Sequence, residues 1–261
     1  MNVNVEIGII GGSGLEKLLE EKEAEIVEIE TPYGFSPKIY IGEINNKKVA
    51  FLPRHGITHA IPPHKVNYRA NIWALKTIGV KRVLATNAVG AINEKYKPGD
   101  FFIPFDLIDF TKTRVQTFFE EGKVIHADCS NIYCKELKDA LIASIKNFKV
   151  KFWEGVLACT EGPRFETPAE IRMMKILGCD AVGMTGAPEA FLAREAGLCY
   201  ASLSFISNMA AGLQNRLTAS EVFKTAQKIL PYLKLILNEA IKKIPEKRMC
   251  DCIKSLEEAE I

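Results

Sequence analysis

The chain has 261 residues, of which 48% are hydrophobic and 25% are charged, and its formal net charge is +2. This composition matches a globular protein with a substantial core and argues against disorder. The small charge and the lack of a basic stripe with interleaved aromatics argue against nucleic acid as a partner. No apolar run approaches about 18 residues, and the N-terminus lacks a signal-peptide pattern. We therefore expect no membrane association and a cytoplasmic location.

Short runs rich in β-formers alternate with amphipathic stretches along the whole chain, a pattern typical of an α/β architecture. The predicted strands cover residues 7–10, 38–41, 49–53, 82–86, 101–104, 155–160, 181–184 and 200–206. The predicted helices cover residues 68–78, 135–147, 168–177, 188–196 and 218–244. No linker or repeat divides the sequence. We therefore expect one domain over residues 1–261, with a C-terminal helical segment from about residue 218.

The last predicted helix has a recognisable start and an interruption. Thr218 and Glu221 have the spacing of a capping box, in which each side chain bonds the other residue's backbone N–H. Pro231 is expected to kink the helix, because proline lacks a backbone donor and its ring clashes with the preceding turn. The apolar stripe of this helix is expected to pack in the core or between subunits.

The first predicted strand runs directly into the sequence Gly11-Gly12-Ser13-Gly14. Glycines let the backbone approach a ligand closely, and the N–H groups at a helix start attract anions. The turn lacks the third glycine of a dinucleotide fingerprint, and no Gly-Lys-Ser/Thr follows as in a P-loop. Taken alone, the motif fits an anion site and an ordinary strand-to-helix turn equally well.

Polar side chains stand where six of the predicted strands end. The carboxyl ends of neighbouring strands line a crevice in open α/β proteins, so we expect these side chains to converge. The alternative is that each of them merely begins a polar loop. Arginine, hydroxyl and backbone N–H donors in this set suit a compact tetrahedral anion, and free phosphate fits them better than a dinucleotide. The side chains are Ser13, Arg54, His55, Thr86, Asn87, Glu161, Arg164, Glu166, Met184, Thr185, Ser207 and Asn208.

Two other chemistries are disfavoured by spacing. His55, His59 and His64 cluster within ten residues, but Gly56 and the Pro62-Pro63 pair argue against the helix that would bring their rings to one metal ion. We therefore expect no metal. No Gly-x-Ser-x-Gly elbow occurs, which disfavours a serine hydrolase.

Several ordered motifs together resemble the trimeric purine nucleoside phosphorylase and methylthioadenosine phosphorylase family, over residues 7 to about 222. They are "GIIGGSGL", "RHG", "HKVNYRANIWAL", "TNAVGAI", "KPGD", "EGPRFET", "MT" before "APE", and "EAGLCYAS". The resemblance implies a single α/β domain whose central mixed, twisted sheet forms a partial barrel flanked by helices. It also implies phosphorolysis: orthophosphate, a co-substrate, attacks the anomeric carbon of a purine nucleoside without metal or cofactor. A homotrimer or a hexamer is expected.

Matching the family's motifs assigns roles to individual residues. The resemblance places phosphate against Ser13, Arg54, His55, Asn87, Ala88 and Thr185. Met184 would pack against the sugar, with His59 near the sugar or phosphate, and Phe165 would pack against the base. Asn208, Glu166 and His55 are the candidate catalytic residues.

The residues expected around the base favour a 6-oxopurine. An ionised Glu166 only accepts hydrogen bonds, and hypoxanthine and guanine carry the N1–H that adenine lacks. The adenine-selective branch of the family has a small hydroxyl residue there. Asn208 can donate to O6 or N7, whereas the adenine branch has aspartates at the positions of Asn208 and Ala210. Glu166 could instead serve only as an N-terminal charge for the helix after Pro168.

The 5′ end of the nucleoside is less constrained. Inosine- and guanosine-type members of the family often have histidine at the position of Ala219, and alanine suits a methylthio group better than a hydroxyl. Val222 and Phe223 could line the same pocket. We therefore expect 5′-methylthioinosine, with inosine or guanosine, and 5′-methylthioadenosine, as alternatives. His126 matches a position that reaches a neighbouring subunit's site; a plain surface loop is the alternative.

Two further questions stay open in the sequence. The same scaffold could serve a non-catalytic nucleoside sensor, and a Rossmann-type oxidoreductase is disfavoured by the missing third glycine. Cys250 and Cys252, one residue apart, could close a strained disulfide or lie unpaired in a solvated tail. The other cysteines lack zinc spacing and are expected to be ordinary thiols.

Overall fold

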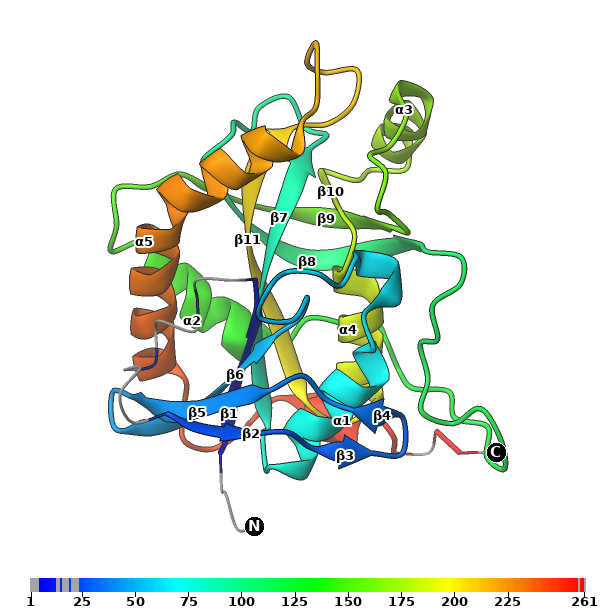
Figure 1. The fold of residues 1–261 in the computed structure, drawn as a ribbon, viewed down its shortest axis with the longest axis vertical. Coiled ribbons are helices and arrows are strands. Elements are labelled where there is room, and N and C mark those ends of the chain that lie inside the picture. The colour runs from blue at the N-terminus through cyan, green and yellow to red at the C-terminus, as the bar shows by residue number, and fades with distance from the viewer. Residues whose placement is uncertain (1–4, 13–14, 16–18, 20–23, 258, 261) are drawn as a thin grey trace.

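The structure is a computed structural model that describes residues 5–12, 15, 19, 24–257 and 259–260. Within these residues, one sheet of nine strands forms the centre of the molecule, in the order β10-β9-β8-β11-β7-β1-β6-β5-β2 (Figure 1). The strands are β1 (Ile7–Gly11), β2 (Glu25–Val27), β5 (Ile39–Ile44), β6 (Lys47–Pro53), β7 (Arg82–Ala91), β8 (Phe101–Phe110), β9 (Phe152–Thr160), β10 (Ala181–Gly183) and β11 (Cys199–Met209). A separate two-stranded sheet joins β3 (Glu30–Thr31) to β4 (Gly34–Phe35).

The sheet closes on itself at one end. Strand β10 pairs with β9 and also with β7, so β7, β11, β8, β9 and β10 form a ring, while β1, β6, β5 and β2 extend from β7 as an open sheet. Strands β1, β6, β7 and β11 are parallel to one another. Strand β10 runs antiparallel to β7, and β8 antiparallel to β11. The expected mixed sheet with a partial barrel is confirmed.

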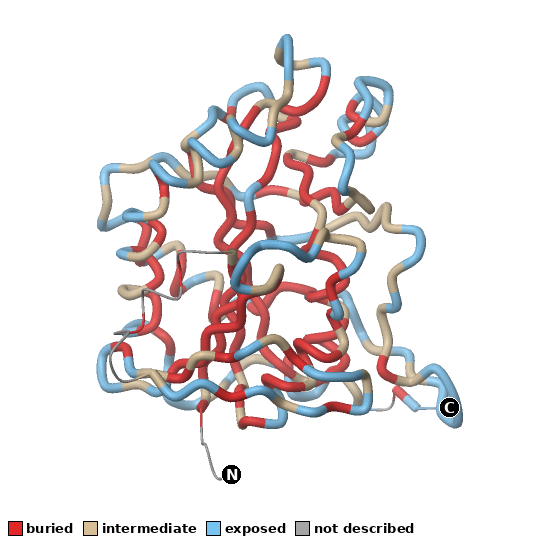
Figure 2. The backbone as a smooth tube through the Cα atoms, in the orientation of Figure 1, coloured by how far each residue is buried: buried red, intermediate tan, exposed pale blue. Residues whose placement is uncertain are grey.

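Helices cover both faces of the sheet (Figure 1). They are α1 (Tyr68–Thr77), α2 (Lys135–Ile145), α3 (Pro168–Ile176), α4 (Gly186–Glu195) and α5 (Ala219–Lys243), with short 3-10 turns at Pro63–Lys65 and Asp251–Lys254. Ile9 of β1 belongs to the core cluster under α2 and α5, whereas its neighbour Ile10 belongs to the cluster under α1 and α4. This alternation is the period of a strand buried on both sides, and the central strands are buried throughout (Figure 2).

Several boundaries differ from the sequence predictions. Strands β7 and β8 are each ten residues long, about twice the predicted length, because their far halves close the ring. The short strands β2, β3 and β4 were not predicted. Helix α5 is continuous through Pro231, and its axis changes direction partway along (Figure 1).

The predicted capping box at α5 is only half formed. The Thr218 hydroxyl accepts a hydrogen bond from the Glu221 backbone N–H at 3.2 Å. The Glu221 carboxylate instead accepts from Gln214 Nε2 at 2.8 Å. A neighbouring side-chain amide has therefore replaced the helix start as its partner. Among the described residues, no helix has the length and apolarity needed to cross a bilayer.

Candidate active site

Strand β7 forms the floor of the candidate site. Among its ten described residues only Ala88 is exposed, whereas Thr86 and Asn87 on one side and Gly90 on the other are buried. Thr86 and Asn87 contact residues expected to bind phosphate, and Gly90 lies beside Asn208, which is expected to bind the base. Three residues of a strand span about 10 Å, which is comparable to the length of a nucleoside. Strand β7 therefore separates the residues expected to bind phosphate from the residue expected to bind the base by about that distance.

Arg54 follows β6 and is held by a buried carboxylate. Its side chain is 3% exposed and that of Glu189, in α4, is 0% exposed. The guanidinium donates from Nε and Nη2 to the two carboxylate oxygens, the second bond being 2.8 Å long, and Nη1 donates to Thr86 O at 2.9 Å. The Tyr200 hydroxyl donates to the same carboxylate at 2.9 Å. Burial alone would lower the pKa of Arg54, but the Glu189 charge outweighs it and raises the pKa.

The glycine turn packs directly against this arginine. The Arg54 backbone N–H donates to Gly11 O at 3.1 Å. A β-carbon on Gly11 would lie 2.8 Å from Thr86 Oγ1, so only glycine fits there. A β-carbon on Gly12 would lie 3.7 Å from the His59 ring, which brings this histidine beside the turn. Ser13 lies outside the described residues.

His55 is neutral at physiological pH. Burial and the Arg54 charge lower its pKa to about 4. Its Nδ1 lies 2.8 Å from the Ile61 carbonyl oxygen. Because a carbonyl only accepts, Nδ1 carries the proton, and the unprotonated Nε2 is an acceptor. His55 therefore adds no positive charge to an anion site, but it can accept a hydrogen bond from a protonated phosphate oxygen.

Asn87 and Thr185 join β7 to the N-terminus of α4. The Thr185 hydroxyl donates to Asn87 Oδ1 at 2.8 Å, and Asn87 Nδ2 donates to Ser202 Oγ at 2.8 Å. Thr185 is the N-cap of α4, yet its side chain does not cap the helix. The first backbone N–H groups of α4, with their partial positive charge, therefore begin beside Asn87.

Asn208 lies beside β7, three residues further along that strand than Asn87. It pairs with Gly90 in the sheet, just after a bulge at Ser207. Its Oδ1 accepts from the Ser207 hydroxyl at 2.6 Å, and its Nδ2 donates to Met209 O at 2.9 Å. A β-carbon on Gly90 would lie 3.2 Å from Asn208 Nδ2. These contacts fix the amide and leave one N–H for a ligand.

Glu166 is the buried carboxylate on the base side. Its Oε1 accepts from the Thr160 hydroxyl at 2.6 Å, and the same hydroxyl lies 3.4 Å from Gly183 O. Burial raises the pKa of Glu166, and the Thr160 hydrogen bond opposes that shift. The carboxylate therefore protonates at a higher pH than an exposed glutamate.

Arg114 was not predicted, yet it ties together the loops on the base side. Its side chain is 2% exposed. Its guanidinium donates to the carbonyl oxygens of Met184 and Glu161, to Thr160 O at 3.2 Å and to Tyr68 Oη at 3.1 Å.

Glu161 anchors the segment that carries Arg114. Its carboxylate accepts from the backbone N–H of Lys112 at 2.6 Å and from the Thr113 hydroxyl at 3.0 Å. The sequence placed Glu161 at a strand end, but this carboxylate is used structurally. Arg164, from the same strand end, pairs with Glu170 on the surface.

The geometric reason given for convergence was wrong for two strands. Strands β9 and β10 run opposite to β7, so their carboxyl ends do not share its edge of the sheet. The side chains meet because the ring brings β10 onto the far half of β7, where Val182 pairs with Gly90. The loop after β10 then places Thr185 on Asn87.

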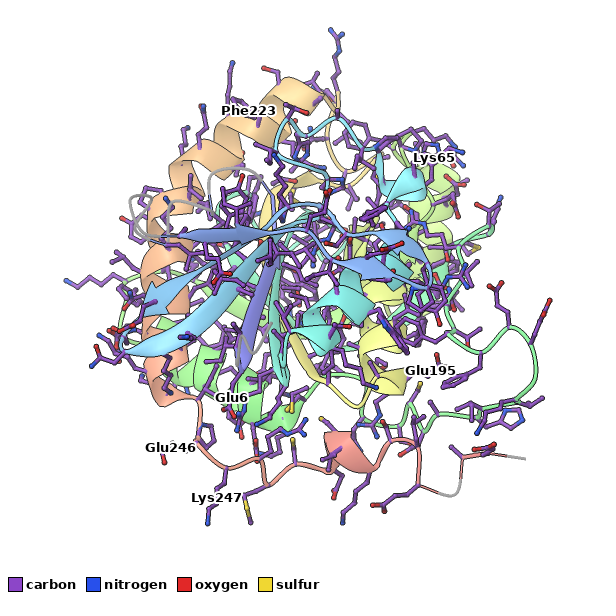
Figure 3. All side chains as sticks on the ribbon, turned by 60° about the horizontal axis from the view of Figure 1, so that its bottom comes forward. Glu6, Lys65, Glu195, Phe223, Glu246 and Lys247 are labelled. Carbon is purple, nitrogen blue, oxygen red and sulfur yellow. The ribbon has the colours of Figure 1, made fainter. Side chains whose placement is uncertain are left out.

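The structure does not bring every predicted residue to this cluster. His126 is exposed, and its backbone N–H donates to Ala259 O at 2.9 Å, in the C-terminal segment. Phe223 is 64% exposed and lies at the outer end of α5 (Figure 3). Ala219 is exposed and Val222 half-buried on the same turn. Gln214 connects this turn to the base side, since its Oε1 accepts from the Met209 N–H at 2.8 Å.

The remaining predicted residues lie next to Gly90, Gly162 and Glu166. Ala210 is buried beside Gly90. Met184 is half-buried, and a β-carbon added to Gly162 would clash with its sulfur. Phe165 is half-buried next to Glu166. The three histidines near residue 55 do not form a set of potential metal ligands among the described residues.

Glu189 was the most consequential omission. The signal was present: a glutamate in a helix made mostly of alanine and other apolar residues, and an arginine directly after a buried strand. Charged residues are almost never fully buried unless they are paired, so two such residues predict an ion pair. The sequence alone could not say which of the two lies nearer the ligand.

Comparison with known proteins agrees with this architecture. Residues 6–242 match the model of the Phosphorylase superfamily. The chain is 46% identical to a probable S-methyl-5′-thioinosine phosphorylase of Methanopyrus kandleri, over 98% of this chain and 99% of that one. It is 48% identical to a probable 6-oxopurine nucleoside phosphorylase of Moorella thermoacetica, over 95% and 96% of the two chains.

A solved methylthioadenosine phosphorylase from an Antarctic soil metagenomic library has the same fold. Its TM-score is 0.94 at 37% identity, covering 99% of this chain and 93% of that chain. The chain described here belongs to the Phosphorylase superfamily.

The buried ion pair gives a prediction for stability. Glu189→Gln removes the charge that compensates Arg54 in the core, so we expect a loss of about 3 kcal/mol in the free energy of unfolding. Glu239→Gln breaks an exposed pair with Lys242 and is the control, with an expected loss within about 1 kcal/mol. Denaturant unfolding measures both variants. Equal losses would contradict a special role for the Arg54–Glu189 pair.

Proposed function

We propose that this protein is a 6-oxopurine nucleoside phosphorylase whose preferred substrate is 5′-methylthioinosine. The reaction transfers a pentosyl group from the purine to orthophosphate and gives the free base and a pentose 1-phosphate. The observation that carries the proposal is the arrangement along β7, where a buried arginine and exposed Ala88 lie a few residues from the fixed amide of Asn208 beside Gly90. Inosine or guanosine, and 5′-methylthioadenosine, are the alternative substrates.

Phosphate is proposed to bind over Ala88. The donors around this exposed position are Arg54 and the backbone N–H groups at Ala88 and at the start of α4. The Thr185 hydroxyl donates its proton to Asn87 Oδ1, so it is proposed to join them as an acceptor from a protonated phosphate oxygen. The Ser13 hydroxyl is proposed to join them. Neutral His55 and Asn87 complete the set, His55 as an acceptor. These donors are preorganised by Glu189 and Ser202, so little reorganisation accompanies anion binding.

The purine is proposed to lie between Asn208 and Glu166. The free N–H of Asn208 donates to O6 or N7, and the Glu166 carboxylate accepts the N1–H of a 6-oxopurine. Adenine offers no N1–H and would leave a buried carboxylate unpaired, which is costly. Phe165 packs against the base, and Ala210 leaves room beside it where a second carboxylate would favour a 6-amino group.

The chemistry needs no nucleophilic side chain. The C1′–N9 bond breaks as a phosphate oxygen approaches C1′ from the opposite face, and the ribosyl group acquires oxocarbenium character. Phosphate stabilises the cation from one side, while Asn208 stabilises the electrons that move onto the purine. Met184 packs against the sugar. We propose that the reaction uses no metal or cofactor.

The 5′ group is proposed to lie toward the start of α5. Ala219, Val222 and Phe223 offer an apolar wall that suits a methylthio group better than a hydroxyl. Exposed Phe223 is consistent with a wall that a second subunit completes. We further propose a homotrimer or a hexamer in the cytoplasm, in which His126 reaches a neighbouring site.

Phosphate dependence tests the reaction class. Release of base from 5′-methylthioinosine should require added phosphate and should produce pentose 1-phosphate, measured by coupled assay and chromatography. Rates with 5′-methylthioadenosine, inosine and guanosine rank the alternatives. Equal release without phosphate would indicate a hydrolase, and binding without turnover would indicate a sensor.

Asn208→Asp tests the assignment of the base. A carboxylate would repel O6 and the Met209 carbonyl, so kcat/KM for 6-oxopurine nucleosides should fall by about 100-fold or more, while turnover of 6-amino substrates improves. Asn215→Asp, in the exposed loop that follows, is the control and should leave both values unchanged. An unaltered preference in Asn208→Asp would refute the assignment.

Glu166 gives a prediction for pH dependence. Its ionised form is the active one and burial raises its pKa, so kcat/KM for a 6-oxopurine nucleoside should fall on acidification, starting above the usual range of a glutamate. Glu166→Gln should lower kcat/KM and abolish this acid limb. Glu239→Gln, which breaks an exposed pair with Lys242 on α5, should keep the wild-type profile. Retention of the limb in Glu166→Gln would assign it to another group.

Arg114 is proposed as a positioning residue. Arg114→Met leaves the carbonyl oxygens of Met184, Thr160 and Glu161 without a donor, so the base and sugar loops shift. We expect kcat/KM to fall by about 100-fold, with partial recovery in Arg114→Lys. Arg69→Met, which breaks a pair with the half-exposed Glu120, is the control. Normal kinetics in Arg114→Met would exclude the positioning role.

A further inference from the structure

Four cysteines from three distant parts of the sequence meet at one point. Cys134, Cys199, Cys250 and Cys252 place their sulfur atoms within 4.8 Å of one another. Cys134 is 2% exposed, Cys199 is 0% exposed and Cys252 is 6% exposed. Because a zinc–sulfur bond is about 2.3 Å long, sulfurs at the corners of a tetrahedral site lie about 3.8 Å apart. The observed separations therefore need only small adjustments to match such a site.

Regular structure holds each of these residues in place. Cys134 is the N-cap of α2, Cys199 is the first residue of β11, and Cys250 is the N-cap of the turn Asp251–Lys254. Cys252 lies within that turn, so the Cys-x-Cys sequence supplies two sulfurs from one bend of the chain. The Met249 backbone N–H donates to the Glu136 carboxylate at 2.7 Å, which fixes the approach to this bend.

The start of α2 favours negative charge at Cys134. The Cys134 sulfur lies at the positive end of the 11-residue helix α2, although it makes no capping hydrogen bond there. Cys199 pairs in register with Arg82 of β7, so both side chains leave the same face of the sheet. Arg82 is 2% exposed; its guanidinium pairs with Glu6 at 3.5 Å and donates to Pro245 O at 2.7 Å and to Glu246 O at 3.1 Å. Arg82 therefore fixes the segment that leads to the Cys-x-Cys bend.

We propose that these four cysteines form a structural tetrathiolate site for zinc(II). All four positions are filled by sulfur, so no coordination position is left for substrate, as in structural rather than catalytic zinc sites. Cys199 and Asn208 lie near opposite ends of β11, about 30 Å apart along the strand. Glu246 and Lys247, which precede the Cys-x-Cys bend, lie at the opposite end of the molecule from Phe223 (Figure 3).

The metal would hold the C-terminal segment against α2 and β11. Beyond the bend, Ser255 Oγ donates to Arg194 O at 2.5 Å, and the backbone pairs Ile125 with Glu260 and His126 with Ala259. The loop that carries His126 is therefore held by the same segment that the zinc ion would fix. Loss of the metal should loosen residues 125–128 as well as the segment after α5.

Metal analysis of the purified full chain tests the proposal. Protein prepared without oxygen from zinc-supplemented cells should contain about one zinc per chain. Cobalt(II) added to the metal-free protein should give the intense visible bands of a tetrahedral tetrathiolate, which zinc then bleaches. Cys250→Ser and Cys252→Ser should each reduce bound zinc about tenfold or more, and hydrogen exchange at residues 125–128 should rise on metal removal.

Cys129→Ser is the matched control, because Cys129 is an exposed cysteine of the loop that precedes α2 and lies outside the cluster. This variant should keep its zinc and its cobalt spectrum. The wild-type cobalt spectrum decides the question even if a cluster variant fails to fold. Four thiols that react with an alkylating reagent equally fast with and without zinc would overturn the proposal. So would an intact mass lower by four hydrogen atoms, which indicates two disulfides, in protein prepared without oxygen.

Discussion

The site depends on a charge placed where water cannot reach it. Arg54 is held in the core by both carboxylate oxygens of Glu189, and this pair fixes where the guanidinium can present its remaining donors. A buried ion pair adds little stability over an apolar contact of the same shape, but it costs several kcal/mol when one partner is removed. The contribution of this pair is therefore geometric: it fixes the relative positions of β6, β7 and α4 around the proposed phosphate position.

The closed ring of strands explains how residues from unrelated segments meet. Strand β7 pairs with β1 over residues 82–85, with β11 along its whole length, and with β10 at Gly90 and Ala91. A single strand therefore bears the donors proposed to bind phosphate at Asn87 and Ala88 and, at Gly90, the neighbour of the amide proposed to bind the base. The proposed reaction places an attacking anion and a departing base on opposite faces of one carbon, and the proposal uses this separation along β7 for the two groups.

Local pattern predicted most of the fold, because the strands and helices have clear periodicity and the sheet is buried on both sides. It failed where long-range pairing decides the outcome, as in the far halves of β7 and β8 and the small strands β2 to β4. Strand direction was the clearest failure: turn chemistry gives no sign that β9 and β10 run against β7. Arg114 and Glu189 were missed because their partners are backbone carbonyls or residues more than 100 positions away.

Strand β11 has a different role at each of its two ends. Near its carboxyl end, the bulge at Ser207 changes the direction of Asn208, the residue proposed to bind the base, and such irregular backbone costs stability. At its first residue, Cys199 lies in the sulfur cluster that fastens the C-terminal segment and, through it, the loop of His126. A rigid anchor at one end of a buried strand limits how far the other end can drift. Fixing β11 at Cys199, far from the proposed site, therefore helps to hold Asn208 in position, because the strand transmits the constraint from one end to the other.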